Sequence, residues 1–393
     1  MNRLKSFSPL YVLFFISVIP HFDIIPGIVH TDDLPILLFF LGAMYLLINN
    51  QNVSLKIEKY MYFIFFIFYL IIQNFFVNGE FLNSEILRFG FYLFVFVFIS
   101  LIGEKNYINT FPFYIFLFLS SFSILSYLFS INLGKDIYQT WNIGINLSDI
   151  EYIKGRTNGF QAGGPNSFAD LITVTGIYSM FRMENNYLRV IIPFSIVGCF
   201  FTYSRFSLIV LVVFILFRIM LQDKKLNTVL LLVGSLLICV NFGLVERFTQ
   251  DDNSGVHDRI EMQSGTLQYV SDDSIINNIF GRGFDNFVVK GNEVLDSAKF
   301  DDNSFSYGPH NSYLFILLNY GVAGLLLYGL IFKDLILNLI KSNEFKYFSP
   351  NFMVVIAFLI LSLSSDILQN HSISWFFYVS YFLYLSEKEN SSF

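Results

Sequence analysis

The sequence predicts an all-α polytopic membrane protein with about twelve transmembrane helices, organised as a single integral membrane domain over residues 1–393. Two observations predict this fold class. Hydrophobic residues make up 54% of the chain and charged residues 14%, whereas a soluble protein carries about a quarter charged residues. In addition, apolar runs of about 20 residues, the length that crosses the hydrocarbon core as a helix, recur along the whole chain.

The first apolar run follows a basic start, MNRLKSF, and resembles a secretory signal peptide. No small-residue cleavage site follows it, and the run continues into His21, Phe22 and Asp23, so we interpret it as an uncleaved first span. Cys199 and Cys239 both lie within apolar runs, which predicts buried thiols. The predicted spans are residues 9–27, 34–49, 60–77, 86–103, 111–133, 166–182, 188–203, 205–221, 226–244, 310–332, 350–367 and 371–386.

The number of spans decides the orientation of the chain. Spans 188–203 and 205–221 meet around Ser204, and they form either a true hairpin or a single broken helix. With twelve spans, more than half of the 24 Lys and Arg residues fall on the side of the two termini, and the short connections on the other side hold Arg88 and Arg205. Because Lys and Arg in short loops set orientation, we expect both termini to be cytoplasmic.

Two external loops are long enough to have a function of their own. The smaller covers residues 134–165 and the larger residues 245–309, and loops of this length are usually functional or disordered. The larger loop contains Val256 to Val270, with apolar residues at loosely helical spacing, and Ile275 to Val289, with two glycines that permit tight turns. We therefore expect short helices in the larger loop.

Three arginines lie in this larger loop, where Asp and Glu outnumber Lys and Arg: Arg247, Arg259 and Arg282. They either pair with neighbours such as Asp258 or Asp285, or bind a phosphate, which a guanidinium holds through two parallel hydrogen bonds. Arg259 is the best placed for phosphate, because its amphipathic segment could lie along the membrane surface.

Arg205 is a lone cation on the external side, at the start of an apolar helix. Arginine at membrane depth is costly and usually faces a cavity or a partner, although it can also extend its guanidinium to a lipid headgroup. Arg88, near the start of the fourth span, has the same two interpretations.

A glycine-rich stretch ends the smaller loop. Arg156 is followed by several glycines, and a Pro165-Asn166 turn then opens a helix. Such a stretch can present backbone N–H groups to an anion at the helix N-terminus. The spacing differs from that of a nucleotide-binding P-loop.

His310 directly follows Gly308-Pro309, a sequence typical of a helix start, on the threshold of a long apolar run. It is either a polar residue that caps the span or a group that takes part in a reaction. His257 and His371 are more typical of ordinary polar positions. No grouping of His, Cys and carboxylates in the sequence has metal-ligand spacing, so we expect no metal and no cofactor.

Several arginines and one histidine at an external membrane boundary suit the chemistry of a lipid-linked phosphate ester. Arginine can neutralise the charge that develops on a diphosphate leaving group, and histidine can take a proton from an attacking hydroxyl.

Four stretches resemble the family of O-antigen polymerases and O-antigen ligases, which make and attach bacterial surface polysaccharide. The family pattern is a Pro-Asn before one span, a Ser-Arg that opens another, an arginine-bearing helix and a Gly-x-Gly in the large loop, and then His-Asn at the next helix. All occur here in that order, within residues 156–324. The stretches are RTNGFQAGGPNSFA (156–169), TYSRFSLIVL (202–211), HDRIEMQSGTLQYV with FGRGFDNF (257–287), and GPHNSYLFILLNYGVAG (308–324).

The resemblance implies a multi-pass enzyme of the bacterial inner membrane, with cytoplasmic termini, a periplasmic active site and a glycosyltransferase C-type helical fold. It implies an undecaprenyl-diphosphate-linked oligosaccharide as donor, used without a metal or nucleotide sugar. Carried over by residue, Arg205 and Arg259 would bind the diphosphate, and His310 would activate the acceptor hydroxyl or stabilise the leaving group. The other candidate substrate-binding residues are Arg156, Asn166, Asn311 and Arg282.

Polymerase and ligase share these features and differ in their acceptor, which is the sugar of a second lipid-linked repeat unit or lipid A-core. The composition, rich in Phe, Ile, Asn and Tyr, resembles the polymerases, and we favour that activity. A flippase of the same lipid-linked sugar is the non-enzymatic alternative, although a transporter would place polar residues inside its spans. Membrane lipids and a chain-length regulator are the expected partners, and nucleic acid is not.

Overall fold

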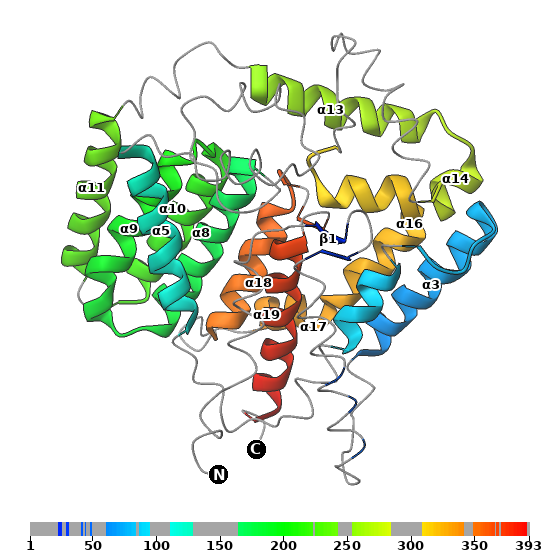
Figure 1. The fold of residues 1–393 in the computed structure, drawn as a ribbon, viewed down its shortest axis with the longest axis horizontal. Coiled ribbons are helices and arrows are strands. Elements are labelled where there is room, and N and C mark those ends of the chain that lie inside the picture. Colours follow the sequence, from blue (N-terminus) through cyan, green and yellow to red (C-terminus); the bar gives the residue numbers. More distant parts are fainter. Residues whose placement is uncertain are drawn as a thin grey trace.

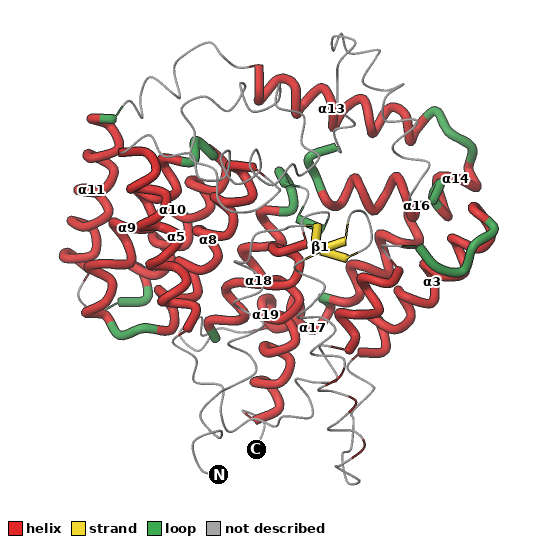
Figure 2. The backbone as a smooth tube through the Cα atoms, in the orientation of Figure 1, coloured by secondary structure: helices red, strands yellow, loops and turns green. Residues whose placement is uncertain are grey.

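The protein is helical in nearly all of the part that the structure describes (Figures 1 and 2). Two short strands, β1 (Asp23–Ile25) and β2 (Val29–His30), form an antiparallel pair. Residues 23–25 of the predicted span 9–27 are therefore extended, while the predicted all-α class holds for the rest of the described chain. The computed structural model describes residues 23–25, 29–30, 41, 44, 48, 60–83, 86–94, 111–128, 164–222, 225–242, 254–283, 309–341, 349–365, 367–368 and 371–390.

Every predicted span from residue 60 onward contains a helix. Spans 9–27 and 34–49 and the loop 134–165 lie mostly or wholly outside the described residues. Residues 86–94 are helical. The other helices are α3 (Met61–Asn78), α5 (Phe111–Leu128), α8 (Gly164–Arg182), η4 (Asn185–Tyr187), α9 (Leu188–Phe201), α10 (Arg205–Met220), α11 (Lys225–Asn241), α13 (Ser254–Ser271), α14 (Ile275–Phe280), α16 (Ser312–Ile331), α17 (Lys333–Lys341), α18 (Pro350–Leu361) and α19 (His371–Asn390).

In the described part of the chain, α3 and α16 are long and apolar enough to cross a membrane by length and composition. Five further helices are apolar but shorter than 18 residues. The count of twelve spans therefore stays a prediction. The shorter apolar segments are Pro112–Leu128, Asn185–Phe201, Lys225–Asn241, Pro350–Leu361 and Ile373–Leu385.

The chain does turn back near Ser204, so the hairpin alternative is confirmed. Helix α9 ends at Phe201, and α10 begins at Arg205 and packs against α9. Between them Tyr203 has a φ of 65°, a left-handed conformation that continues neither helix. Both helices also pack on α8.

The helices form two groups that meet at α18 and α19 (Figure 1). Helices α5, α8, α9, α10 and α11 pack together on one side, while α3 and α16 pack on the other. Helix α19 lies between the groups, and all its residues from 373 to 385 are buried. Aromatic rings fill this centre: Tyr92 stacks on Tyr378 at 4.3 Å, and Phe63 meets Tyr378 edge-on at 5.7 Å.

Helix α13 runs across one end of this assembly, and α19 extends away towards the opposite end (Figure 1). The larger loop thus contains the 18-residue α13, over the segment with helical spacing, and the 6-residue α14, directly before the two glycines.

Candidate functional site

A buried carboxylate lies near the start of α8. Asp170 is 1% exposed, and the Ser207 hydroxyl of α10 donates a hydrogen bond to its Oδ1 at 2.6 Å. Ser204, the residue before α10, shares a 2.7 Å hydrogen bond with Ser207. The second carboxylate oxygen, Oδ2, is buried and makes no hydrogen bond of normal geometry to a described residue. A buried polar atom in this state is costly, which makes Asp170 the focus of the site.

Sequence reasoning missed Asp170, although a signal was present. The residue lies inside the predicted span 166–182, where a carboxylate is expensive and usually functional. It also follows Asn166 by four residues, so the two side chains share one face of α8.

Arg259 of α13 reaches the connection between α18 and α19. Its Nη1 donates to the Ser364 hydroxyl at 2.9 Å and to the Ser364 carbonyl at 3.3 Å. The Arg259 charge and the Ser365 side chain both act on the Asp170 carboxylate. The turn at residues 362–365, which we call the serine turn, therefore joins Arg259 to Asp170.

The N-terminus of α16 rests on the same serine turn. The Ser312 backbone N–H donates to the Ser362 carbonyl at 2.9 Å, and the Ser312 hydroxyl donates to the Ser365 carbonyl at 2.9 Å. This contact places the start of α16 beside the segment that Arg259 contacts.

Asn311, and not His310, caps α16. The Asn311 side-chain oxygen accepts hydrogen bonds from the backbone N–H groups of Tyr313 at 2.9 Å and Leu314 at 3.2 Å. His310 precedes the cap with a φ of 48°, a left-handed conformation that is uncommon outside glycine and is found more often at functional sites. Capping therefore does not explain this histidine.

Two further arginines approach the site from other helices. Arg205 is the first residue of α10 and directly follows Ser204. Arg88, in the helical residues 86–94, donates from Nη1 to the Leu368 carbonyl at 3.1 Å, and the Leu368 backbone N–H donates to the Ser312 hydroxyl at 3.5 Å. Arg156 lies outside the described residues.

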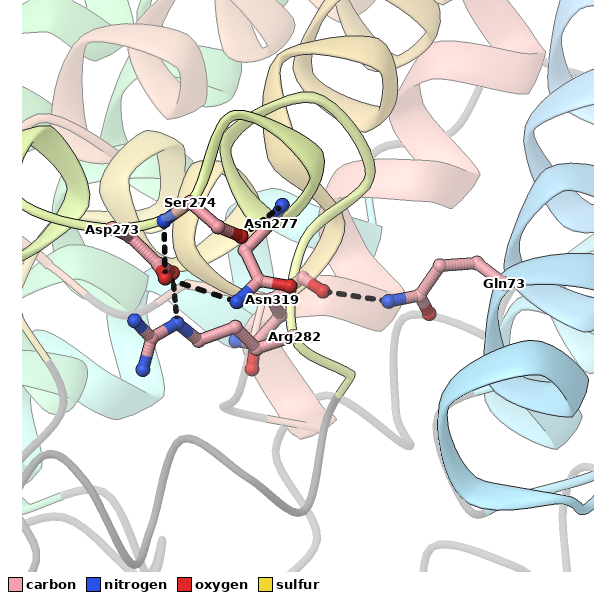
Figure 3. A network of polar contacts seen from close by, with 6 residues as sticks. All are labelled: Gln73, Asp273, Ser274, Asn277, Arg282 and Asn319. Carbon is pink, nitrogen blue, oxygen red and sulfur yellow. Dashed lines mark hydrogen bonds and ion pairs between the residues drawn. The ribbon is translucent and has the colours of Figure 1, made fainter.

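Arg282 lies elsewhere, in a network of its own (Figure 3). It forms an ion pair with Asp273, and its guanidinium stacks over the Tyr269 ring at 4.0 Å. Asn277 and the Ser274 backbone N–H also donate to the Asp273 carboxylate. Asp273 follows Arg259 by fourteen positions of helix and turn, which is about 20 Å at a helical rise. Arg282 therefore pairs with a neighbouring carboxylate, and its role in binding substrate stays a prediction.

The same network closes a break in α16. Gly321 has φ 67° and ψ −173°, which divides α16 into two half-helices. The Asn319 carbonyl, freed by the break, accepts from the Gly283 backbone N–H at 2.9 Å. It also accepts from the Gln73 amide at 3.0 Å (Figure 3). The Tyr69 hydroxyl donates to the Tyr320 carbonyl at 2.7 Å. The predicted span 310–332 is therefore discontinuous.

Replacing Gly281 by alanine is expected to destabilise this junction by about 1–3 kcal/mol. Gly281 has a φ of 79°, and an added Cβ would lie 2.2 Å from the Asn319 carbonyl oxygen. Gly234→Ala in α11 is the matched control, because its Cβ would meet nothing within 4 Å. The measurement is the melting temperature of the purified protein in detergent. Equal melting temperatures for the two variants would contradict the close packing described here.

In the described residues, no three His, Cys, Asp or Glu side chains lie close enough together to hold a metal ion. The site brings together the guanidinium of Arg259, the carboxylate of Asp170 and several serines, beside the helix that follows His310. A guanidinium binds anions and an imidazole exchanges protons, so the site can stabilise a phosphate leaving group beside a hydroxyl.

Residues 190–329 match the family model described as O-antigen ligase. The matched segment runs from within α9 to within α16; it contains Arg205, Arg259 and His310, and Asp170 precedes it. The match supports the family of O-antigen ligases and polymerases, whose members are glycosyltransferase-like enzymes of O-antigen and lipopolysaccharide assembly, and it does not separate the two activities. No curated protein matches the chain.

Proposed function

We propose that this protein is an O-antigen polymerase of the bacterial inner membrane. It transfers the growing glycan from undecaprenyl diphosphate to the sugar of a new lipid-linked repeat unit, on the periplasmic side. One observation carries this proposal: Arg259, Asp170 and the residues after His310 meet at the serine turn, although they come from α13, α8 and α16. The arginine that binds anions and the histidine that exchanges protons are thus brought to the end of the molecule that α13 crosses.

The proposed reaction is a displacement at the anomeric carbon of the donor glycan. The bond from this carbon to the phosphate oxygen breaks, and undecaprenyl diphosphate leaves with the electron pair. The acceptor hydroxyl oxygen forms the new glycosidic bond, and its proton passes to the imidazole of His310. Arg259 and Arg205 bind the leaving diphosphate, whose negative charge grows as the bond breaks.

Asp170 and Ser364 support this reaction by orienting Arg259. Ser364 accepts hydrogen bonds from the guanidinium, and the Asp170 carboxylate supplies an opposite charge. A guanidinium held in one orientation stabilises developing charge without reorganising during the reaction.

O-antigen ligase is the second candidate, because the matched family model carries that description. The ligase transfers the same glycan to lipid A-core. Deleting the gene from its native strain separates the two: a polymerase-null cell still caps its core with a single repeat unit, whereas a ligase-null cell attaches none.

Elongation by the purified protein tests whether it is an enzyme. The full-length protein in lipid vesicles is incubated with lipid-linked repeat units, and the products are separated by size. A ladder of longer glycans is the expected result. Movement of the unaltered lipid-linked sugar across the vesicle membrane, with no elongation, would refute the proposal and favour a flippase.

A further inference from the structure

An apolar surface is exposed where α14 lies beside the end of α3 (Figure 1). In α14 Ile275 is 77% exposed and Ile276 is 70% exposed, and in α3 Phe76 is 80% exposed. Seven large apolar side chains contribute, and we call them the rim patch. Its members are Phe76, Phe81, Leu82, Ile275, Ile276, Ile279 and Phe280.

The orientation of α14 is set by hydrogen bonds to neighbouring helices. The Tyr69 hydroxyl of α3 donates to the Phe280 carbonyl at 3.0 Å. Immediately after α14, the Gly283 backbone N–H donates to the Asn319 carbonyl at the break in α16. Hydrogen bonds therefore hold the α14 part of the rim patch against α3 and α16, and its exposure does not arise from a loose loop.

The rim patch continues an exposed apolar stripe along α3. Phe65, Phe68 and Ile72 are 49%, 59% and 54% exposed, and together with Phe76 they lie on one side of the helix at spacings of three and four residues. Helix α3 is long and apolar enough to cross a membrane, so this stripe is the side that faces lipid. The rim patch extends the lipid-facing side from α3 onto α14.

The chemistry of α14 permits contact with hydrocarbon. Its sequence, IINNIF, has no ionisable residue, and the flanking Asp273 and Arg282 form an ion pair with each other. The Ser274 side chain accepts from the Asn277 backbone N–H, and the Gly281 backbone N–H donates to the Asn277 carbonyl at 2.7 Å. Because hydrocarbon offers no hydrogen bonds, backbone groups at membrane depth have to be paired within the protein.

We infer that α14 is a membrane anchor, with the rim patch buried among the acyl chains of the outer leaflet. In the described part of the larger loop, α13 thus lies outside the membrane and α14 enters it. The anchor holds one end of α13 at the lipid surface while Arg259, about 20 Å away, sits over the serine turn. This sets the depth of Arg259 relative to the bilayer, and it applies equally to a polymerase and a ligase.

Spin-label accessibility in lipid vesicles tests the anchor in the full-length protein. The buried cysteines Cys199 and Cys239 are replaced by alanine, and a nitroxide is attached to Ile276→Cys. Gln268→Cys, at an exposed polar position of α13, is the matched control, and Phe76→Cys is the reference for lipid. Collision rates are measured with oxygen, which concentrates in hydrocarbon, and with a water-soluble nickel complex.

The label at 276 is expected to show an oxygen-to-nickel ratio close to that at 76 and several-fold higher than that at 268. A ratio equal to that at 268 would mean that α14 lies in water, and protection from both reagents would mean that a protein partner or a second copy covers it. Either result overturns the inference. Because no substrate is used, the outcome is independent of the elongation assay.

Discussion

An Arg259→Lys variant is expected to elongate glycans about 100-fold more slowly than the wild-type protein, which is the loss typical of removing one preorganised donor to developing charge. Lysine keeps the positive charge but cannot form the two parallel hydrogen bonds by which a guanidinium holds a phosphate. The Nη1 bonds to the carbonyl and hydroxyl of Ser364 also hold the planar guanidinium in one orientation, which a freely rotating ammonium does not reproduce. Arg205→Lys is expected to fail for the same reason.

Initial rates with a lipid-linked repeat unit, compared at equal amounts of folded protein, are the measurement. Arg189→Lys is the matched control, because Arg189 is an exposed residue in the first turn of α9, far along the chain from the serine turn. Near-normal glycan length from both Arg259→Lys and Arg205→Lys would refute their assignment to the diphosphate.

Coupling between Arg259 and Asp170 sharpens this test. Asp170→Asn keeps an oxygen to accept the Ser207 hydrogen bond but removes the charge that acts on Arg259. We expect the double variant to lose less activity than the product of the two single losses, because both changes disturb one guanidinium. Multiplicative losses would show that Asp170 acts independently of Arg259.

A His310→Asn variant is expected to lose about 100-fold to 10,000-fold of the elongation rate, the range for removing a positioned proton acceptor. Asparagine was chosen for its backbone preference, since it tolerates the left-handed conformation that His310 adopts, with a φ of 48°. The helix cap at Asn311 is untouched. The variant thus removes the imidazole that accepts the proton and keeps the local fold.

Two measurements separate catalysis from folding at this position. His310→Gly is expected to melt at or above the wild-type temperature, because glycine adopts a positive φ without strain, and yet to elongate as poorly as His310→Asn. If His310→Asn retains normal elongation, the imidazole has no role in the reaction and the proposed proton acceptor is wrong.

The helices of this protein follow from local sequence. Apolar runs are about as long as the helices that form from them, and the spans predicted from residue 60 onward each contain one. The helical pattern over Val256–Val270 in the larger loop corresponds to α13. These predictions succeeded because hydrophobic periodicity and turn residues act over neighbouring positions.

Roles that depend on a partner were predicted less well. His310 could be interpreted as a cap, but the side chain of the next residue, Asn311, does the capping. Arg282 either pairs with a neighbouring carboxylate or binds phosphate by its sequence, and only the structure shows that its partner is Asp273. Asp170 was passed over, since a single carboxylate in an apolar run shows nothing of the serines and the arginine that gather around it.

By itself the sequence predicted a helical membrane protein, and it determined the positions of most helices and the residue types available for phosphate chemistry. Tertiary structure alone decided which of those residues meet. Arg259 and Ser364 are 105 positions apart, and Tyr69 reaches Tyr320 across 251 positions. Contacts at such separations depend on how whole helices pack and on where α16 breaks beside the turn after α14. No local sequence pattern encodes the packing or the position of the break.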